Sequence, residues 1–294
     1  MLVKDVKKMN PFKALALVVK YEFKNAAKKF IPLYAVLLIV ALVGGLLQSP
    51  FSEQVEKISQ ERAQIEMNGD VDAYSMQMEL RSNDFKRGVI YTVIYFFLII
   101  YSIAIVIISV LNLSKRFKKS MLQDEAYLNL VLPVSMSQHI WGRFINALIW
   151  MIICLLAISV SSCFYMIRNG ALEFLPELVD IFKENGFEKI GCSLPMFFFT
   201  LIAFIFMILI SIILAIYFVN SFAHLFPKAR TLVKICSIIL CIYLFFNLPK
   251  WVIRITDDID FVPGMWLLIG TYFVLSAVYM TVTQLVFMKR LNLE

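Results

Sequence analysis

The chain has 294 residues, of which 61% are hydrophobic and only 17% are charged. A soluble domain carries about 25% charged residues, so this composition excludes an ordinary soluble globular protein. The net charge of +7 does not indicate a nucleic-acid partner. The basic residues gather beside the ends of apolar runs, where they set membrane orientation and meet anionic lipid headgroups.

Six apolar runs account for the excess of hydrophobic residues. Each is about 17 residues or longer, which is enough to cross a hydrocarbon core of about 30 Å as a helix. We therefore predict an all-α integral membrane protein with a six-helix transmembrane domain over residues 31–288. The predicted spans cover about 31–47, 88–113, 140–167, 194–226, 231–248 and 261–288.

Residues 1–30 form a basic lead into the first span. Between Pro11 and Phe30, apolar residues recur at steps of three and four, which is the period of one helix face. This apolar stripe consists of Phe12, Leu15, Val19, Phe23, Ala26 and Phe30, and a second stripe consists of Lys13, Lys20, Lys24 and Lys28. The pattern predicts an amphipathic helix in the headgroup plane, with the lysines reaching for lipid phosphates. The alternative is a simple extension of the first span.

A polar segment, 49–87, follows the first span. Val55, Ile58 and Ile65 indicate one amphipathic helix. The residues around Gly69 indicate a turn, and helical sequence then continues to Phe85. We predict a helical hairpin outside the membrane, which serves either as a lid or as a connection.

The second polar segment, 112–139, separates the second and third spans. It opens with a basic cluster of Lys115, Arg116, Lys118 and Lys119, and it continues through the acidic pair Asp124 and Glu125 to Pro133. A membrane subunit driven by a separate ATPase needs one rigid cytoplasmic feature on which the ATPase can act. This segment is the best candidate in the sequence.

The later connections are short. Residues 168–193 carry apolar side chains at helical spacing, which predicts a helix on the outer surface. A tight basic turn at 227–230 joins the fourth and fifth spans, and an acidic loop precedes the sixth. Cys163 and Cys192 both fall near the outer ends of their spans, so a disulfide between them stays open.

Charge counting predicts the orientation. With the amino terminus inside, eighteen of the 28 Lys and Arg residues lie on the cytoplasmic side, and sixteen of the 21 acids lie on the outer loops. Because positive charge is retained inside, both termini should be cytoplasmic.

The sequence carries no pattern for catalysis or metal binding. It has no GxxxxGK[ST] loop for phosphate, and its two histidines, His139 and His224, belong to no metal motif. The polar residues inside the spans favour helix packing, but some of them could line a pathway: Asn146, Ser159, Ser162 and Gln284. We therefore predict a transport subunit without enzyme activity or cofactor of its own, whose energy comes from a partner if it is not passive.

Two stretches carry a resemblance to a known family. One is the lead-in from Lys20 to Lys24, KYEFK, and the other is the run from Asp124 to Ser135, DEAYLNLVLPVS. With the order of spans, they make the chain resemble the membrane subunit of bacterial ABC exporters of the type-2 permease family. The resemblance implies a plasma-membrane protein that pairs with a second permease copy or a homologous permease. It also implies two copies of an ATP-binding subunit, which hold ATP and Mg.

The resemblance further implies a coupling helix over about 117–128 that docks on the ATP-binding subunit. Its candidate contact residues are Phe117, Lys118, Lys119, Gln123, Asp124, Glu125, Tyr127 and Leu128. The lysines can pair with acids of the ATPase, and Tyr127 and Leu128 can supply an apolar anchor. The near absence of ionisable residues at mid-membrane depth in the spans favours an amphipathic or hydrophobic cargo, such as a peptide antibiotic or a drug-like compound.

Two other function classes stay open. A secondary transporter or channel would need an ionisable residue at mid-membrane depth to bind the coupling ion, and the spans offer almost none. A scaffold or sensor subunit that transports nothing would need no such residue, and the sequence does not argue against it.

Overall fold

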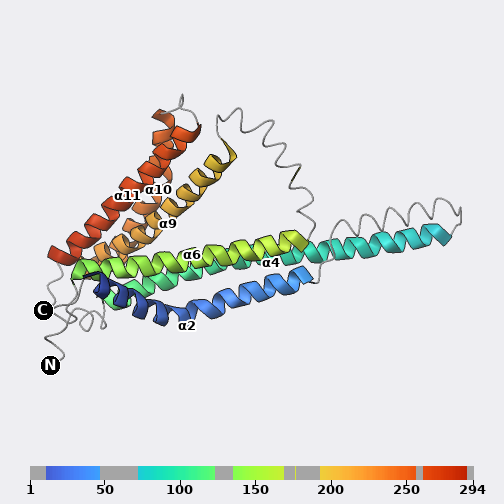
Figure 1. Cartoon of the computed structure of the whole chain (residues 1–294), viewed down its shortest axis with the longest axis horizontal. Coiled ribbons are helices and arrows are strands. Elements are labelled where there is room, and N and C mark those ends of the chain that lie inside the picture. The colour runs from blue at the N-terminus through green and yellow to red at the C-terminus, as the bar shows by residue number, and fades with distance from the viewer. Residues whose placement is uncertain are drawn as a thin grey trace. The chain divides into compact units, whose positions relative to one another are not determined.

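The computed structural model describes residues 11–46, 72–122, 135–168, 176, 193–255 and 261–289. The elements in these ranges are helices (Figure 1): α2 (Pro11–Leu46), α4 (Asp72–Leu122), α6 (Met136–Arg168), α9 (Leu194–His224), the short 3-10 helix η2 (Pro227–Ala229), α10 (Arg230–Ile255) and α11 (Phe261–Lys289). Within the described residues, six helices are long and apolar enough to cross a membrane, which makes this a multi-pass membrane protein. The prediction of six long apolar helices that are candidates for membrane spans is confirmed.

The first helix differs from the prediction. Residues 11–46 form one continuous helix, so the described part of the chain shows no separate interfacial helix ahead of the span. The only helix breaker before the glycine pair at 44–45 is Pro32. A proline removes one backbone hydrogen bond, but membrane helices tolerate it because neighbouring groups satisfy the freed carbonyl.

Helix α4 also exceeds the predicted second span at both ends. It begins at Asp72, so the second arm of the predicted hairpin is continuous with the span. It ends at Leu122, so the basic start of the 112–139 segment extends the same helix. No proline, and no glycine apart from Gly88, occurs between 72 and 122, so nothing in this sequence stops the helix. The first arm of the hairpin and the outer segment 169–192, apart from residue 176, lie outside the described residues.

The chain divides into two compact units. Unit 1 comprises Met1–Lys28, Ser109–Ile152 and Ile181–Glu294, and unit 2 comprises Lys29–Ile108 and Ile153–Asp180. Helices α2, α4 and α6 each contribute to both units, whereas α9, α10 and α11 belong to unit 1.

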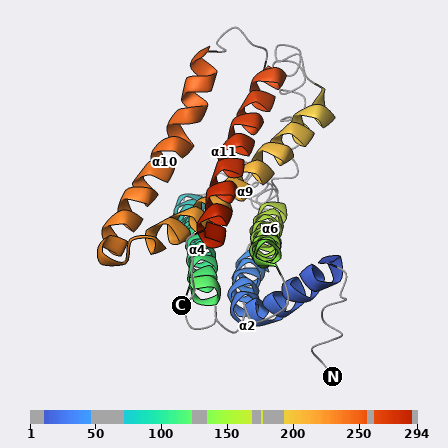
Figure 2. The same ribbon diagram turned by 90° about the vertical axis from the view of Figure 1, so that its left-hand side faces the viewer.

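In unit 1, α9, α10 and α11 pack side by side (Figures 1 and 2). Aromatic rings hold them: Phe218 stacks on Tyr279 with ring centroids 5.3 Å apart, and Tyr272 contacts both Phe204 and Phe245. Buried hydroxyls donate to carbonyls one turn back, as Thr283 does to Tyr279 over 2.7 Å. Such bonds satisfy polar groups where no water is present.

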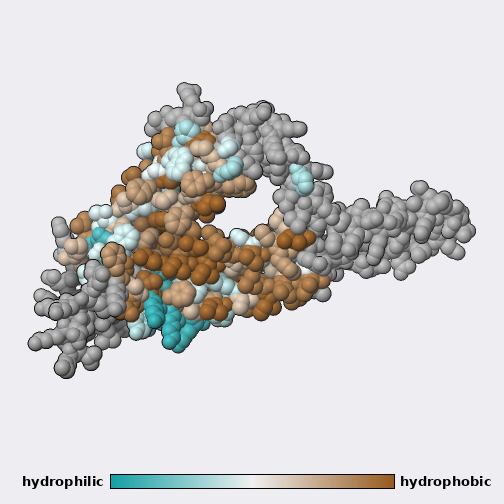
Figure 3. Space-filling model, in the orientation of Figure 1, coloured by the Kyte–Doolittle hydropathy of each residue, from teal (hydrophilic) through white to brown (hydrophobic). Residues whose placement is uncertain are grey.

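In unit 2, the remaining parts of α2, α4 and α6 pack together. Tyr101 donates a hydrogen bond to the Leu33 carbonyl over 3.5 Å, and Tyr95 stacks on Tyr165 with ring centroids 5.5 Å apart. Hydrophobic side chains cover most of α6 on the face in Figure 3, as expected for a surface in contact with lipid.

Candidate functional site

A buried cluster of charges joins α2, α4 and α6 in unit 1. The Glu22 Oε2 atom accepts a hydrogen bond from Arg116 Nε over 2.7 Å, and its Oε1 atom lies 3.7 Å from Arg143 Nη2. The side chains are 15%, 21% and 5% exposed for Glu22, Arg116 and Arg143, respectively. One carboxylate therefore serves two guanidinium groups that come from two other helices.

Each helix presents these residues from its buried face. Ala26, four residues after Glu22, is 1% exposed, and residues four apart share a helix face. On α4, the buried Leu113, Phe117 and Ser120 recur at steps of four and three residues beside Arg116. The apolar periodicity of α2 and α4 thus carries the charged groups to the place where these helices meet.

Arg143 also binds the last turns of α4 directly. Its Nε atom donates to Ser120 Oγ over 2.7 Å, and its Nη2 atom donates to the Ser120 carbonyl over 3.4 Å. Its Nη1 atom donates to the His139 carbonyl in the first turns of α6 over 3.2 Å. The end of α4 and the beginning of α6 are therefore fastened together, and these are the two ends that flank residues 123–134.

Aromatic packing ties the same end of α4 to α9 and α11. Phe117 is 2% exposed and stacks on Tyr217 with ring centroids 3.9 Å apart. Its edge meets Phe287 with ring centroids 6.0 Å apart. The last two turns of α4 thus contact α2, α6, α9 and α11 within unit 1.

The cavity inside this cluster is too small for cargo. Its volume is about 10 Å³, and its lining includes Glu22, Arg116, Arg143 and Asn146. Pockets that hold small molecules measure roughly 300–1,000 Å³. The cluster is therefore a structural joint and not a site for a small molecule.

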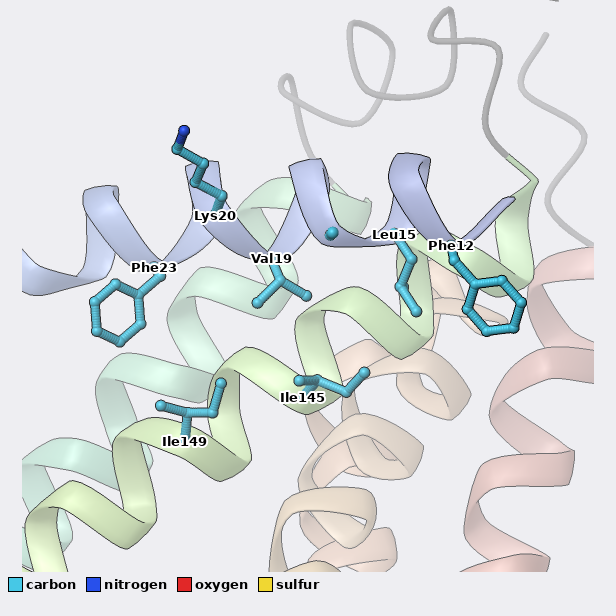
Figure 4. A pocket seen from close by; sticks show the side chains of 8 residues that line it. Phe12, Leu15, Val19, Lys20, Phe23, Ile145 and Ile149 are labelled. Atoms are coloured by element: carbon cyan, nitrogen blue, oxygen red, sulfur yellow. The ribbon is translucent and has the colours of Figure 1, made fainter. Parts of the chain in front are cut away.

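The apolar stripe predicted on the first helix packs against α6. Figure 4 shows Leu15, Val19 and Phe23 of α2 pointing toward Ile145 and Ile149 of α6, whereas Lys20 points away. Phe23 stacks on Trp150 with ring centroids 4.7 Å apart. The apolar stripe is therefore present on α2. Beyond its first residue, its described members pack against protein and not against lipid. Phe12, at its start, is 79% exposed.

The lysine stripe lies on the outer surface of α2. Lys20, Lys24 and Lys28 are exposed, and the side chain of Lys13 lies outside the described residues. This placement suits contact with lipid phosphates.

Only part of the predicted coupling segment is described. Phe117 is buried in the joint, Lys118 is half-buried and Lys119 is exposed in the last turns of α4. The remaining predicted contacts lie outside the described residues: Gln123, Asp124, Glu125, Tyr127 and Leu128. The burial of Phe117 gives its ring a packing role within the joint.

The four polar residues proposed for a pathway do not form one group. Asn146 is 3% exposed and lines the charge cluster, and Gln284 is half-buried on α11. Ser159 and Ser162 are exposed on α6 in unit 2. Cys163 carries a free thiol, and Cys192 lies outside the described residues.

No group of three or more His, Cys, Asp or Glu that could hold a metal occurs within the described ranges.

Sequence reasoning placed Arg116 in a basic cluster but did not recognise its partnership with Glu22 and Arg143. A signal was present. Glu22 is the only acid between Asp5 and Glu53, and Arg143 is the only Lys, Arg, Asp or Glu from Met136 to Ile167. A lone acid and a lone base inside apolar helices are expected to pair, because an unpaired charge is costly there.

Comparisons of the chain with protein-family models, with curated proteins and with solved structures found no match.

Proposed function

We propose that this chain is the membrane subunit of an ATP-driven exporter of the type-2 ABC class. It forms half of a translocation pathway and couples through residues 112–139 to a separate ATP-binding subunit. The proposal rests on the KYEFK and DEAYLNLVLPVS motifs, on six membrane-spanning helices, and on the joint at the end of α4.

The charge cluster is the observation that carries the proposal. A partner that moves residues 123–134 acts on the end of α4 and the beginning of α6. Arg143 holds these two ends together through Ser120, and Glu22 links both of them to α2. A push on the connecting segment therefore reaches three helices at once, because buried ion pairs resist separation.

Charge at the end of α4 supports docking of an ATPase. Lys115 and Lys119 are exposed there, and Lys118 is half-buried. Exposed cations steer an acidic partner and set its orientation more than they add affinity. Asp124 and Glu125 would then meet basic groups of the same partner.

The remaining features belong to the same proposal. Both termini are cytoplasmic in a bacterial plasma membrane, and a second permease copy or a homologous permease completes the pathway. The cargo is amphipathic, because the described spans offer few charged groups to a polar solute. ATP and Mg are held by the two ATP-binding subunits.

A secondary transporter gains no support from the buried carboxylate. Glu22 is engaged by two guanidinium groups, and the cavity beside it measures about 10 Å³. That space holds about one water molecule, so a hydrated coupling ion cannot bind there.

Photo-crosslinking in the native membrane tests the docking surface. A benzophenone amino acid replaces Lys119 in one variant and Tyr127 in another, and Ile239, which is 62% exposed on α10, provides the control position. We expect a soluble ATPase in the adducts at 119 and 127 and none at 239. Adducts that contain no ATPase at either test position would contradict the proposal.

A further inference from the structure

A second cavity opens on the surface of unit 1 between α4, α9 and α10. Its volume is about 400 Å³, within the range of pockets that hold small molecules. The lining is apolar except for Ser114, Asn220 and Lys234. The lining residues of α10 run from Lys234 to Phe246, and 12 residues of helix extend over roughly 18 Å. The cavity is therefore an elongated apolar groove with polar groups at one end.

The polar end of the groove is built from fixed groups. Asn220 Nδ2 donates to Ser114 Oγ over 2.9 Å and to the Ile216 carbonyl over 2.8 Å. Asn220 is 5% exposed, so its position is set by packing as well as by these bonds. Lys234 belongs to the same lining.

Two further cations lie near Lys234. Lys118 at the end of α4 and Arg230 at the beginning of α10 are near enough for their charges to disfavour the protonated forms of both Lys234 and His224. Within the described part of the chain, no carboxylate lies within ion-pair distance of Lys118, Arg230 or Lys234. Three like charges that gather without an opposite charge favour an anionic ligand.

The depth of these cations matches that of lipid phosphates. Helix α9 ends at His224 and α10 begins at Arg230, so Lys234 lies about 6 Å inside the helix end. The headgroup region on each side of a bilayer is several Å thick beyond a hydrocarbon core of about 30 Å. Cationic side chains near helix ends extend to that level.

We propose that this groove binds an anionic phospholipid. One acyl chain lies along the apolar wall toward Phe246, and the phosphate contacts Lys234 with Lys118 and Arg230. A second copy of the chain is a poorer occupant, because a two-fold contact would bring these cations against their own counterparts. Lipid also has direct access, since Leu111, Ile242 and Phe246 at the rim are 50%, 53% and 58% exposed.

Native mass spectrometry of the purified chain in mild detergent tests the charged end. Phosphatidylglycerol and phosphatidylcholine with identical acyl chains are added in separate titrations, and we expect phosphatidylglycerol to bind more tightly. Lys234→Gln should weaken phosphatidylglycerol binding about fivefold, the effect of one cation at a membrane surface. Lys250→Gln, an exposed position later in α10, should leave binding unchanged.

The apolar end is tested by filling the groove from its rim. Ile242→Trp places a large side chain in the lining, whereas Ile239→Trp places it at an exposed α10 position outside the lining. We expect Ile242→Trp to abolish bound phosphatidylglycerol and Ile239→Trp to retain it. Both positions face outward, so each variant should remain folded. Thermal melting of both variants checks this.

Three results would overturn the proposal. Equal binding of the two lipids would remove the role of the cations. Displacement of phosphatidylglycerol by inorganic phosphate alone would indicate an anion site without an acyl chain. Loss of a dimer in Ile242→Trp, with lipid binding unchanged, would identify a second copy as the occupant.

Discussion

Glu22 is the residue on which the described joint depends. Its carboxylate is the only one among the described residues that line the cluster, and it faces two guanidinium groups. If its charge is removed, Arg116 and Arg143 remain close together with no opposite charge between them. Removing one partner of a fully buried pair costs about 3–5 kcal/mol, because the other charge stays buried without compensation. The side chains of Glu22 and Arg116 are 15% and 21% exposed, so the cost here should lie at or below the lower end of that range.

We therefore expect Glu22→Gln to lower the free energy of unfolding of the detergent-solubilised protein by roughly 3 kcal/mol. Glutamine keeps the shape of the side chain, so the loss reports on charge. Lys24→Gln, an exposed change on the same helix, provides the control and should shift stability by less than about 0.5 kcal/mol. Equal melting of the two variants would show that the cluster contributes no stability.

A double-mutant cycle tests whether Glu22 and Arg116 act as a pair. Arg116→Gln removes one of the two cations and leaves Arg143 beside the carboxylate, so its cost should be smaller than that of Glu22→Gln. The double variant should be less destabilised than the sum of the two single variants, by about 1–3 kcal/mol. Strict additivity, measured from the melting temperatures, would contradict a direct interaction.

At the scale of elements, the contact between α2 and α6 depends on a glycine. A Cβ atom at Gly142 would lie 2.8 Å from Val18 Cγ1 and 3.3 Å from Val18 Cβ. Valine is branched at Cβ and stiff, so its side chain cannot rotate away without strain. Gly142 therefore permits the two helices to approach, as small residues do at interfaces between membrane helices.

Gly142→Ala should destabilise the protein by about 1–3 kcal/mol through overpacking. Val18→Ala in the same chain should restore part of the loss because it removes the clashing methyl groups. Gly270→Ala is the matched control: nothing lies within 4 Å of its Cβ position, and alanine favours a helix. Stability is measured by melting curves in detergent for the wild type, Gly142→Ala, Gly142→Ala with Val18→Ala, and Gly270→Ala. Identical behaviour of Gly142→Ala and Gly270→Ala would disprove the close contact.

Phe117 couples the end of α4 to α9 and α11. Phe117→Ala removes a ring that stacks on Tyr217 and meets Phe287, and we expect a loss of about 3–5 kcal/mol. Phe273→Ala deletes the same group at a position that is 62% exposed on α11, so its cost should be much smaller. If both variants melt alike, the ring of Phe117 does not hold these helices.

The sequence was sufficient to predict the spans, because six apolar runs leave no other arrangement of the backbone in lipid. The predicted ends of α2 and α4 were less accurate. No residue stops either helix there, and the sequence changes from polar to apolar while the backbone stays helical. The apolar stripe of α2 was visible as periodicity, but periodicity does not distinguish a lipid-facing stripe from one that packs on Ile145 and Ile149.

The charge cluster could not be predicted from local pattern. Glu22 and Arg116 are separated by 94 residues, so their meeting is a property of tertiary packing. Only two features indicated that a partner was required: Glu22 is a single acid among lysines, and Arg143 is a single base in apolar sequence. Residues 123–134, which carry the docking prediction, lie outside the described ranges and their contact with an ATPase stays a prediction.

At the scale of the whole molecule, the two units share three helices. Helices α2, α4 and α6 each pass from unit 1, which contains the charge cluster, into unit 2. The joint in unit 1 is thus covalently continuous with the helices of unit 2.

Orientation is a second property of the whole molecule. Positive charge retained inside predicts that both termini are cytoplasmic. A reporter that is active only in the cytoplasm should work when it is fused after Glu294 and should fail when it is inserted within 49–71. Activity at the loop and inactivity at the terminus would reverse the orientation and would place residues 112–139 outside the cell.

The central claim is that an ATPase acts on the segment between α4 and α6. The most direct measurement is purification of the tagged chain from its native host in mild detergent, followed by the mass of the intact complex and the identity of every subunit. We expect a soluble ATPase in that complex and its loss in the double variant Asp124→Ala with Glu125→Ala, while the chain itself remains folded. A complex without any ATPase would disprove the coupling and would favour a passive or scaffolding role.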